Sequence, residues 1–402
     1  MLNNVEEYAG DSILSLMEGY KNDSRADKVN LSIGFYYDED GVVPGLRVIK
    51  ELIRSSPAYG AEACLYLPME GDAAFRRGVE GHLFRNVSPE LVKRVATVQT
   101  VGGSGALRIG ADFLKRYFPD SDVWVSDPTW DNHLAIFGGA GFNAHRYPYL
   151  NAKRDGVDFA SMSAVLRDLP EHSVVLLHAC CHNPTGVDLT AGEWGEVFKI
   201  CKDKKLIPFL DAAYVGFGES VDDDLAGITA LAESGITGVV SNSFSKVFSL
   251  YGERVGSLSI ICEEEGIAAR VLGQLQSTIR RSYSTPPRFG SMLVAKVLSD
   301  LELRSKWELE VEDMRLRMVK MREALQAELQ HLASHHDWGY LTLQKGMFSY
   351  TGLTAEAVNQ LQNDYAIYMV RSGRMCIAGL NDRNFKLVAA AIASVSARIA
   401  AL

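Results

Sequence analysis

The repeated alternation of short β-branched runs with glycine-bearing turns and helical segments constrains the fold of this chain most. One such run at 94–101 precedes a GGSG turn and a helical pattern at 106–118, and the runs DVWVSD, SVVLLHACC and LIPFLD follow it. Apolar strands connected in this way are typical of a mostly parallel sheet with helices on both faces. The sequence therefore predicts an α/β fold.

Past Pro287 the pattern changes. Residues 301–332 carry apolar side chains at helical spacing among many charges, which predicts one long amphipathic helix. Two strand-like segments follow, YLTLQKGMFSYTGL and AIYMVRSGRMCIAGL, and a closing helix begins near Arg383. We expect an N-terminal arm and part of a small domain at 1–45, a large domain at 46–300, and a bridging helix with a small α+β domain at 301–402.

Charge and leader signals limit the partners and the location. The 402 residues have a formal net charge of -9, without the basic footprint that nucleic acid or an anionic membrane would require. The N-terminus is acidic and lacks the basic and apolar regions of a signal peptide, and no run approaches the length of a membrane span. We expect a cytoplasmic protein whose partners are small molecules.

The cysteines predict neither a disulfide framework nor a metal site. Six cysteines in a chain of this length are sparse, so we interpret them as reduced core thiols. Cys180, Cys181 and His182 are adjacent, but neighbouring side chains on an extended segment point to opposite faces, and the usual zinc spacing is absent. We therefore predict no metal there.

The stretch SNSFSKVFSLYGERVG contains a lysine, Lys246, between apolar β-prone flanks, so it is predicted near a strand end and partly enclosed. Ligands of open parallel sheets gather at the carboxyl ends of the strands. The residues that follow the predicted strands are Gly102, Gly103, Ser104, Trp130, Asn183, Asp211, Tyr214, Ser243, Ser245 and Lys246.

These side chains suit a phosphorylated cofactor. The GGSG turn before a helix offers backbone N–H groups to a phosphate, and Ser243, Ser245 and Arg254 could complete the cradle, although glycine turns before helices are also common as structure alone. Asp211 ends an apolar strand, either as a buried carboxylate with a cationic partner or as a helix N-cap. An amine, a buried carboxylate and a phosphate cradle together match pyridoxal 5′-phosphate.

Longer motifs extend this interpretation over nearly the whole chain. SNSFSKVFSLYGERVG, HNPTG, DAAYVGFG, VGGSGALRIGADFLKRYF, SDPTWDNH and SGRMCIAGL together resemble the fold-type I, class I pyridoxal-phosphate-dependent aminotransferases. LYLPMEG and VLLHACCHNPTG are most similar to the bacterial aromatic amino acid (tyrosine) aminotransferases, siblings of aspartate aminotransferase. The resemblance implies a large domain with a mostly parallel sheet, a smaller α+β domain, and a homodimer with shared active sites.

The resemblance also implies roles for individual residues. It gives the Schiff-base lysine as Lys246, the partner of the pyridine nitrogen as Asp211, and the O3′ contacts as Asn183 and Tyr214. The phosphate contacts fall on Gly103, Ser104, Ser243, Ser245 and Arg254, with Tyr66 from the other subunit. Trp130 would stack on the cofactor ring, and His133 would support Asp211.

For the substrate, Arg374 matches the arginine that binds the α-carboxylate, and Arg280 matches the arginine of the neighbouring chain that binds a side-chain carboxylate. The adjacent Arg281 is the alternative to Arg280, and Gly34 corresponds to small-domain backbone near the substrate, as Trp130 and Asn183 do on the large domain. The implied reaction moves the amino group of Tyr, Phe, Asp or Glu to a 2-oxo acid in two half-reactions through an aldimine, with Lys246, Asp211 and Tyr214 as the catalytic residues.

Three alternatives remain open at this point. The first is an aspartate aminotransferase with little aromatic activity, and the second is a lyase or decarboxylase of the same fold. The third is a non-catalytic sensor domain, which usually needs an output module that this chain has no spare segment to form. Two carboxylate-binding arginines favour the aminotransferase over the lyase.

Overall fold

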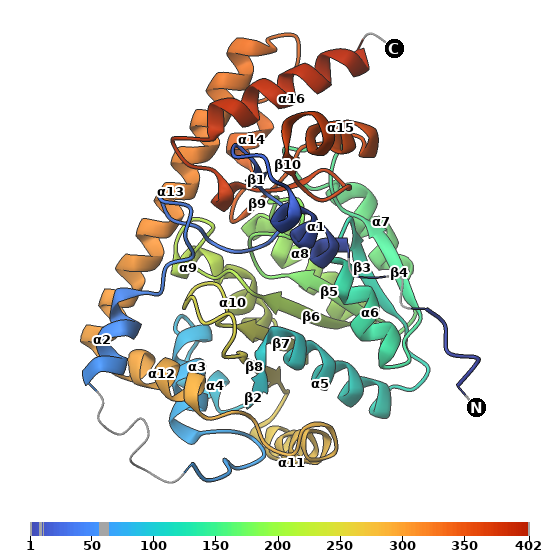
Figure 1. Cartoon of the computed structure of the whole chain (residues 1–402). Helices are drawn as coiled ribbons and strands as arrows, with labels where there is room; N and C mark the ends of the chain where they lie inside the picture. The colour runs from blue at the N-terminus through green and yellow to red at the C-terminus, as the bar shows by residue number, and fades with distance from the viewer. Residues whose placement is uncertain (1, 8–9, 11, 56–63, 401–402) are drawn as a thin grey trace. The chain divides into compact units, whose positions relative to one another are not determined.

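The computed structural model describes residues 2–7, 10, 12–55 and 64–400, and the chain divides into two compact units. The first unit comprises Met1–Val43, Arg317–Leu343 and Met347–Leu402, and the second comprises Pro44–Leu316 and Gln344–Gly346. Figure 1 labels the helices and strands of both units. In the described ranges, no helix is long and apolar enough to cross a membrane.

The second unit is built on a seven-stranded sheet within the described residues, with the strand order β2-β8-β7-β6-β5-β3-β4. Its strands are β2 (Val95–Val101), β3 (Val123–Asp127), β4 (Ala144–Pro148), β5 (Val174–His178), β6 (Ile207–Ala212), β7 (Gly238–Ser243) and β8 (Val255–Ile261). The pairs from β4 through β7 are parallel, and β8 is antiparallel to both of its neighbours. The predicted α/β fold with a mostly parallel sheet is confirmed.

Helices cover both faces of this sheet, which is why its central strands are buried throughout. The helices of the unit are α2 (Arg47–Ser55), α3 (Ala73–Leu83), α4 (Pro89–Val92), α5 (Gly102–Tyr117), α6 (Asp131–Gly139), α7 (Phe159–Asp168), α8 (Ala191–Lys204), α9 (Val221–Asp224), α10 (Ala226–Glu233), α11 (Glu265–Ser282) and α12 (Phe289–Ser299). Helix α5 packs on β2, β7 and β8, whereas α8 and α10 pack on each other and on β6 and β7 (Figure 1). Every residue of β5, β6, β7 and β8 is buried.

The first unit contains two small two-stranded sheets. Its elements are α1 (Ser12–Asn22), β1 (Val29–Asn30), α14 (Tyr340–Leu343), β9 (Phe348–Tyr350), α15 (Ala355–Tyr365), β10 (Ile367–Tyr368), β11 (Arg374–Cys376), the 3-10 helix Ile377–Gly379 and α16 (Phe385–Ala400). Strand β1 pairs parallel with β10, and β9 pairs antiparallel with β11. The predicted strand-like segment YLTLQKGMFSYTGL contains β9, but its first part, YLTL, forms the helical turn α14, which follows the hydrogen bond that Asp337 accepts from the Gly339 N–H.

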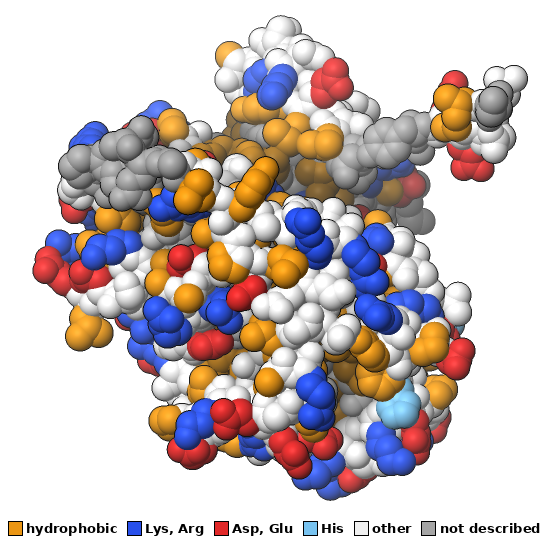
Figure 2. Space-filling view, turned by 90° about the horizontal axis from the view of Figure 1, so that it is seen from below, with side chains coloured by type: hydrophobic (Ala, Val, Ile, Leu, Met, Phe, Trp, Pro, Cys, Tyr) orange, Lys and Arg blue, Asp and Glu red, His pale blue; other side chains and the backbone are white. Residues whose placement is uncertain are grey.

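The long helix predicted over 301–332 is confirmed as α13 (Leu301–Leu332), and the division between the two units falls within it, after Leu316. Figure 2 shows one face of the molecule, on which hydrophobic side chains lie in small groups among Lys, Arg, Asp and Glu. Both signs of charge are therefore interspersed over this face. Most cysteines are buried thiols as expected, but Cys64 is exposed and is not part of the core.

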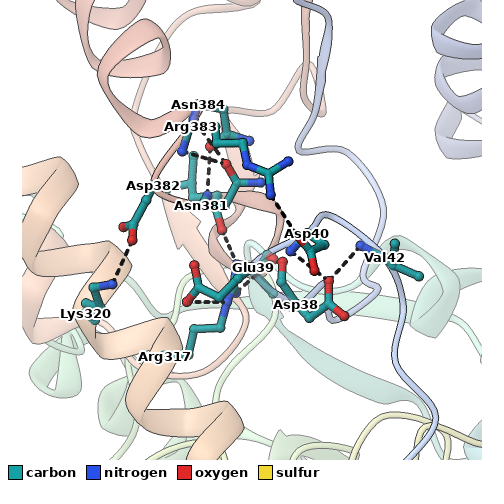
Figure 3. A network of polar contacts seen from close by, with 12 residues as sticks. Asp38, Glu39, Asp40, Val42, Arg317, Lys320, Asn381, Asp382, Arg383 and Asn384 are labelled. Atoms are coloured by element: carbon teal, nitrogen blue, oxygen red, sulfur yellow. Dashed lines mark hydrogen bonds and ion pairs between the residues drawn. The ribbon is translucent and has the colours of Figure 1, made fainter.

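Arg317, in the part of α13 that belongs to the first unit, joins two segments far apart in the sequence (Figure 3). Its Nη2 donates to the carbonyl oxygens of Asp38 at 3.1 Å and Leu380 at 2.5 Å, and its Nη1 donates to that of Ala378 at 3.4 Å. Its Nε lies 3.4 Å from the Glu39 carboxylate. Arg317 is only 8% exposed, and it donates to the buried carbonyl groups of Ala378 and Leu380, whereas the Asp38 carbonyl also accepts the Gly41 N–H at 3.0 Å.

We predict that Arg317→Met markedly destabilises the protein. It would leave the buried carbonyl groups of Ala378 and Leu380 without this donor, and an unsatisfied buried polar group costs about 1–3 kcal/mol, so a loss of about 2 kcal/mol or more is expected. The control is Lys320→Met on the same helix, which breaks an exposed 3.0 Å ion pair with Asp382 and should cost at most about 1 kcal/mol. Urea unfolding of both variants measures the difference, and equal losses would contradict the role given to Arg317.

Candidate active site

The second unit brings the predicted residues together at the carboxyl ends of its parallel strands. Helix α5 begins at Gly102, directly after β2, and Lys246 follows the end of β7 by three residues. Lys246 is half-buried, so the prediction of a partly enclosed lysine near a strand end is confirmed. Asp211 lies one residue before the end of β6 rather than after it.

Asp211 is a buried carboxylate held by two donors. Its Oδ1 accepts a hydrogen bond from Ser241 Oγ at 2.8 Å, and its Oδ2 lies 3.1 Å from His133 Nε2. Thr129 Oγ1 lies 2.9 Å from His133 Nδ1. A Thr129 hydroxyl that donates to Nδ1 places the imidazole proton on Nε2, facing the carboxylate. These contacts contradict the N-cap alternative and confirm the predicted contact between His133 and Asp211.

The surroundings of Asp211 favour its ionised form. Burial by itself would raise the pKa of Asp211, but the hydrogen bonds from His133 and Ser241 help to outweigh burial and hold the pKa below its ordinary value. The neighbouring His178 is buried, and burial lowers its pKa to about 3. At neutral pH the site therefore presents an anionic carboxylate beside a neutral imidazole of His178.

The N-terminus of α5 forms a narrow cradle with the loop that follows β7. A Cβ atom on Gly102 would lie 2.4 Å from Nη2 of Arg254, and one on Gly103 would lie 3.0 Å from Cβ of Ser243. Arg254 Nη1 donates to Ser245 Oγ at 3.2 Å. Glycine is therefore needed for the close approach, and the cradle combines N–H groups of the first helical turn, hydroxyls and a guanidinium, which suit a phosphate.

Tyr214 lies beside the lysine, and the other predicted ring contacts lie near the ends of neighbouring strands. Lys246 Nζ is 5.0 Å from the centroid of the Tyr214 ring. The Trp130 ring lies 5.2 Å from the His133 ring and nearly perpendicular to it, and Asn183 is buried in the turn after β5. An ionised carboxylate, a half-buried amine and a phosphate-type cradle within one unit fit the chemistry of the expected cofactor.

The first unit holds Gly34 and Arg374 together through Phe348. Arg374 Nη2 donates to the Ser32 carbonyl oxygen at 2.6 Å, and the guanidinium carbon lies 4.4 Å from the Phe348 ring centroid. A Cβ atom on Gly34 would lie 2.9 Å from Cζ of the same ring. Arg374 is only 6% exposed, so its guanidinium is held in one place.

Two of the predicted residues are exposed on the single chain. Tyr66 is 93% exposed, and Arg280 is exposed at the end of α11, where its Nη1 bonds Ser284 Oγ. The alternative residue, Arg281, is also exposed and donates to Thr278 Oγ1 at 3.4 Å.

The sequence did not predict the buried aromatic cluster that contacts the loop containing Lys246. Trp307 is fully buried and its Nε1 donates to the carbonyl oxygen of Val247 at 2.8 Å, next to Lys246. Its ring stacks on Phe248 at 4.6 Å and meets the edge of the His82 ring at 5.4 Å. The only signal in the sequence was the place of Trp307 on the apolar side of the predicted 301–332 helix, which does not reveal its partner.

The fold and this site together define an aminotransferase of the pyridoxal-phosphate-binding type, and the comparisons agree. The family described as "Aminotransferase class I and II" matches residues 26–392, and the chain belongs to this family. The aromatic-amino-acid aminotransferase of Escherichia coli (strain K12) is 53% identical over 396 residues, which cover 98% of this chain and 100% of that protein. The predicted family and fold class are thus confirmed.

Two solved structures are similar over nearly the full length. The aromatic-amino-acid aminotransferase from Burkholderia pseudomallei, covalently bound to pyridoxal phosphate, has a TM-score of 0.95 and 45% identity, covering 98% of this chain and 99% of that chain. The psychrophilic aromatic amino acid aminotransferase from Psychrobacter sp. B6, cocrystallised with aspartic acid, has a TM-score of 0.95 and 46% identity, covering 98% and 100%.

The buried His82 gives the site a testable acid sensitivity. Burial lowers its pKa to about 3, from an unfolded value of about 6.5. Below about pH 6.5 the unfolded chain binds a proton that the folded chain excludes, so this group makes the free energy of unfolding fall by about 1.4 kcal/mol for each pH unit of acidification toward pH 3. We expect His82→Leu to make the slope between pH 4 and 6 shallower by up to that amount. Urea titrations should show no such change for the exposed His331→Leu, and an unchanged slope in His82→Leu would refute the assignment.

Proposed function

We propose that this chain transfers the amino group of aromatic (Tyr, Phe) and dicarboxylic (Asp, Glu) amino acids to 2-oxo acids such as 2-oxoglutarate, with pyridoxal 5′-phosphate as its cofactor. The observation that carries the proposal is the buried, ionised Asp211 in the same unit as the half-buried Lys246 and the glycine cradle. The relatives named above add support, since one is covalently bound to pyridoxal phosphate and another was cocrystallised with aspartic acid.

The cofactor-binding residues form two groups, those that would hold the phosphate and those that would contact the pyridine ring. Gly103, Ser104, Ser243, Ser245 and Arg254 would hold the phosphate at the N-terminus of α5, where free N–H groups and the helix dipole favour an anion. Bound there, pyridoxal phosphate supplies an electron sink for the carbanion at the substrate Cα.

The ring contacts come from the neighbouring strand ends. Asp211 would hold a proton on the pyridine nitrogen, which its low pKa favours, while Asn183 and Tyr214 would orient O3′. Trp130 would cover one face of the ring.

Lys246 serves as the attachment point and then as the base. Its Nζ would bind the cofactor covalently until the amino group of the substrate replaces it, after which the free amine moves a proton at the substrate Cα. Its half-buried place beside Tyr214 limits the water that could compete for that proton.

Substrate carboxylates would be bound by two arginines with different access. Arg374 would bind the α-carboxylate that every amino acid carries, next to Gly34, whereas Arg280 would bind the distal carboxylate of Asp or Glu. Arg280 and Tyr66 are exposed on the single chain, which supports a homodimer in which each reaches the neighbouring active site. We further assign the two compact units to the predicted large and small domains, and the protein to the cytoplasm.

The direct test is a panel of amino donors assayed against 2-oxoglutarate, with both products measured. Turnover with Tyr, Phe, Asp and Glu supports the proposal. Turnover with Asp and Glu alone would instead favour an aspartate aminotransferase with little aromatic activity, and release of ammonia or carbon dioxide would favour a lyase of the same fold.

We predict that borohydride fixes the cofactor on Lys246, because reduction traps the covalent link between the cofactor and its lysine. Peptide mapping should find the label on Lys246, and Lys246→Ala should retain cofactor through the phosphate cradle while it loses most turnover. A label on another lysine would exclude this assignment, and so would near-normal turnover of Lys246→Ala.

We predict that the two arginines separate by substrate class. A charge-assisted hydrogen bond contributes about 1.5–3 kcal/mol, so Arg280→Leu should lower kcat/KM for Asp and Glu by roughly tenfold to a hundredfold or more, with Phe and Tyr nearly unaffected. Arg374→Leu should weaken all four donors similarly. Arg281→Leu is the matched control at the adjacent exposed position and should leave all four nearly unchanged. Half-reactions with Asp and Phe measure each variant, and an equal loss of both donors in Arg280→Leu would refute the division of roles.

A further inference from the structure

The adjacent cysteines after β5 differ from the sequence prediction in their geometry. The prediction placed their side chains on opposite faces because it took the segment as extended, but Cys181 has a φ of +50°, in the left-handed region. The backbone therefore turns, and Cys180 and Cys181 have their sulfur atoms and a carboxylate oxygen of Asp224 all within 4.8 Å of one another. Of the two reasons given for excluding a metal at these cysteines, the one that placed the side chains on opposite faces is therefore wrong.

Asp224, at the end of α9, lies beside the two thiols, and one of its carboxylate oxygens accepts fewer hydrogen bonds than the other. Its Oδ2 accepts hydrogen bonds from the N–H groups of Gly216 and Gly218, at 2.7 and 2.9 Å. Within the described part of the chain, its Oδ1 accepts one hydrogen bond, from the N–H of Glu219 at 3.1 Å. Because each carboxylate oxygen offers about two acceptor sites, Oδ1 keeps room for a further partner while the hydrogen bonds hold the carboxylate in place.

The three groups form a ligand set of recognisable type. All are buried, at 3%, 2% and 6% exposure for Cys180, Cys181 and Asp224. Tetrahedral zinc binds sulfur at about 2.3 Å, so its ligand atoms lie about 3.8 Å apart, and closure around an ion needs inward movement of on the order of 1 Å. We propose that Cys180, Cys181 and Asp224 form a binding site for a thiophilic divalent cation of the Zn²⁺ or Cd²⁺ class, separate from the cofactor site.

Binding requires a defined exchange of protons. The hydrogen bond between the two thiols, together with burial, raises the pKa of the Cys180 thiol, so it stays protonated until an ion arrives. As each sulfur bonds to the cation its proton leaves to solvent, Asp224 binds in its ionised form, and nothing is oxidised or reduced. Each ion bound near neutral pH therefore releases two thiol protons.

The site touches the backbone that carries two proposed cofactor contacts. Cys181 Sγ lies 3.9 Å from the carbonyl oxygen of Tyr214, and Asp188 accepts the N–H groups of Cys181 and His182 at 2.8 Å each, just before Asn183. Drawing the sulfur atoms inward would strain both loops, so occupancy should lower turnover. This consequence rests on the proposed function, whereas the ion site itself does not.

The experiment titrates the cofactor-loaded protein with Cd²⁺ in a Cys64→Ser background, which removes the exposed thiol. Ultraviolet absorbance detects cadmium–thiolate bonds, and calorimetry in two buffers counts the released protons. We expect one ion for each chain, two protons for each ion, an affinity that rises about a hundredfold per pH unit, and at least a tenfold loss of turnover. The histidine cluster at Asp211 has no thiolate and cannot produce this absorbance.

Matched variants locate the ion. Cys180→Ala and Cys181→Ala should each weaken Cd²⁺ binding at least tenfold, whereas Cys201→Ala, which removes a buried thiol elsewhere, should change it less than twofold. Absence of the thiolate band, release of fewer than two protons, or an equal loss in Cys201→Ala overturns the site, and the first two need no folded variant. Binding as expected with unchanged turnover overturns the coupling to Tyr214. Cd²⁺ binding is measured without turnover, so the outcome for the ion site itself does not depend on whether the donor panel succeeds.

Discussion

The burial of one ionised carboxylate, Asp211, is the constraint on which the rest of the site depends. A buried carboxylate is costly unless hydrogen-bond donors stabilise its charge, and here the donors are Ser241 and His133. His178, Asp211 and Ser241 lie in register across the parallel strands β5, β6 and β7. A slip of one residue in the pairing of β6 with β7 would turn the Ser241 side chain to the opposite face of the sheet and remove this donor from Asp211. The ionised state of Asp211 therefore depends on the strand register.

Loops that follow the strands carry most of the chemistry, and buried contacts from behind keep them in place. Trp307 donates to Val247 O beside the lysine, Asp188 accepts two N–H groups in the turn after β5, and Asp224 accepts three in the loop after β6. None of these groups needs to touch a substrate. They satisfy buried backbone groups that irregular loops would otherwise leave unpaired, and in doing so they restrict the positions of Lys246, Asn183 and Tyr214.

The sequence was most informative where the pattern is local and repeated. The apolar runs predicted the parallel strands, the helical period predicted α13 over its whole length, and the turn chemistry directed attention to Lys246 and Asp211. It failed where the deciding partner is distant. The Trp307 contact with a carbonyl 60 residues away, the Arg317 contacts with both ends of the chain, and the left-handed turn at Cys181 leave no trace in local periodicity. The predicted strand over YLTL failed because a turn that begins at Asp337 competes with β propensity.

Asp211 and Asp224 show why burial alone does not set the charge of a site. Burial raises the pKa of Asp224 to about 6, because backbone N–H groups are its main compensation and Asp188 adds like charge, whereas the imidazole of His133 lowers that of Asp211. The two residues change the pH dependence of folding stability in opposite directions. Asp211 contributes stability above its unfolded pKa that is lost as the pH falls through its lower folded value. Asp224 binds a proton in the folded state between about pH 3.9 and 6, so acidification through that window favours folding at this residue. The imidazole of His133 therefore allows the buried Asp211 to remain an anion that can pair with the protonated pyridine ring of the cofactor. Asp224 has no such imidazole partner among the described residues, and it is better suited to holding a loop or binding a metal ion.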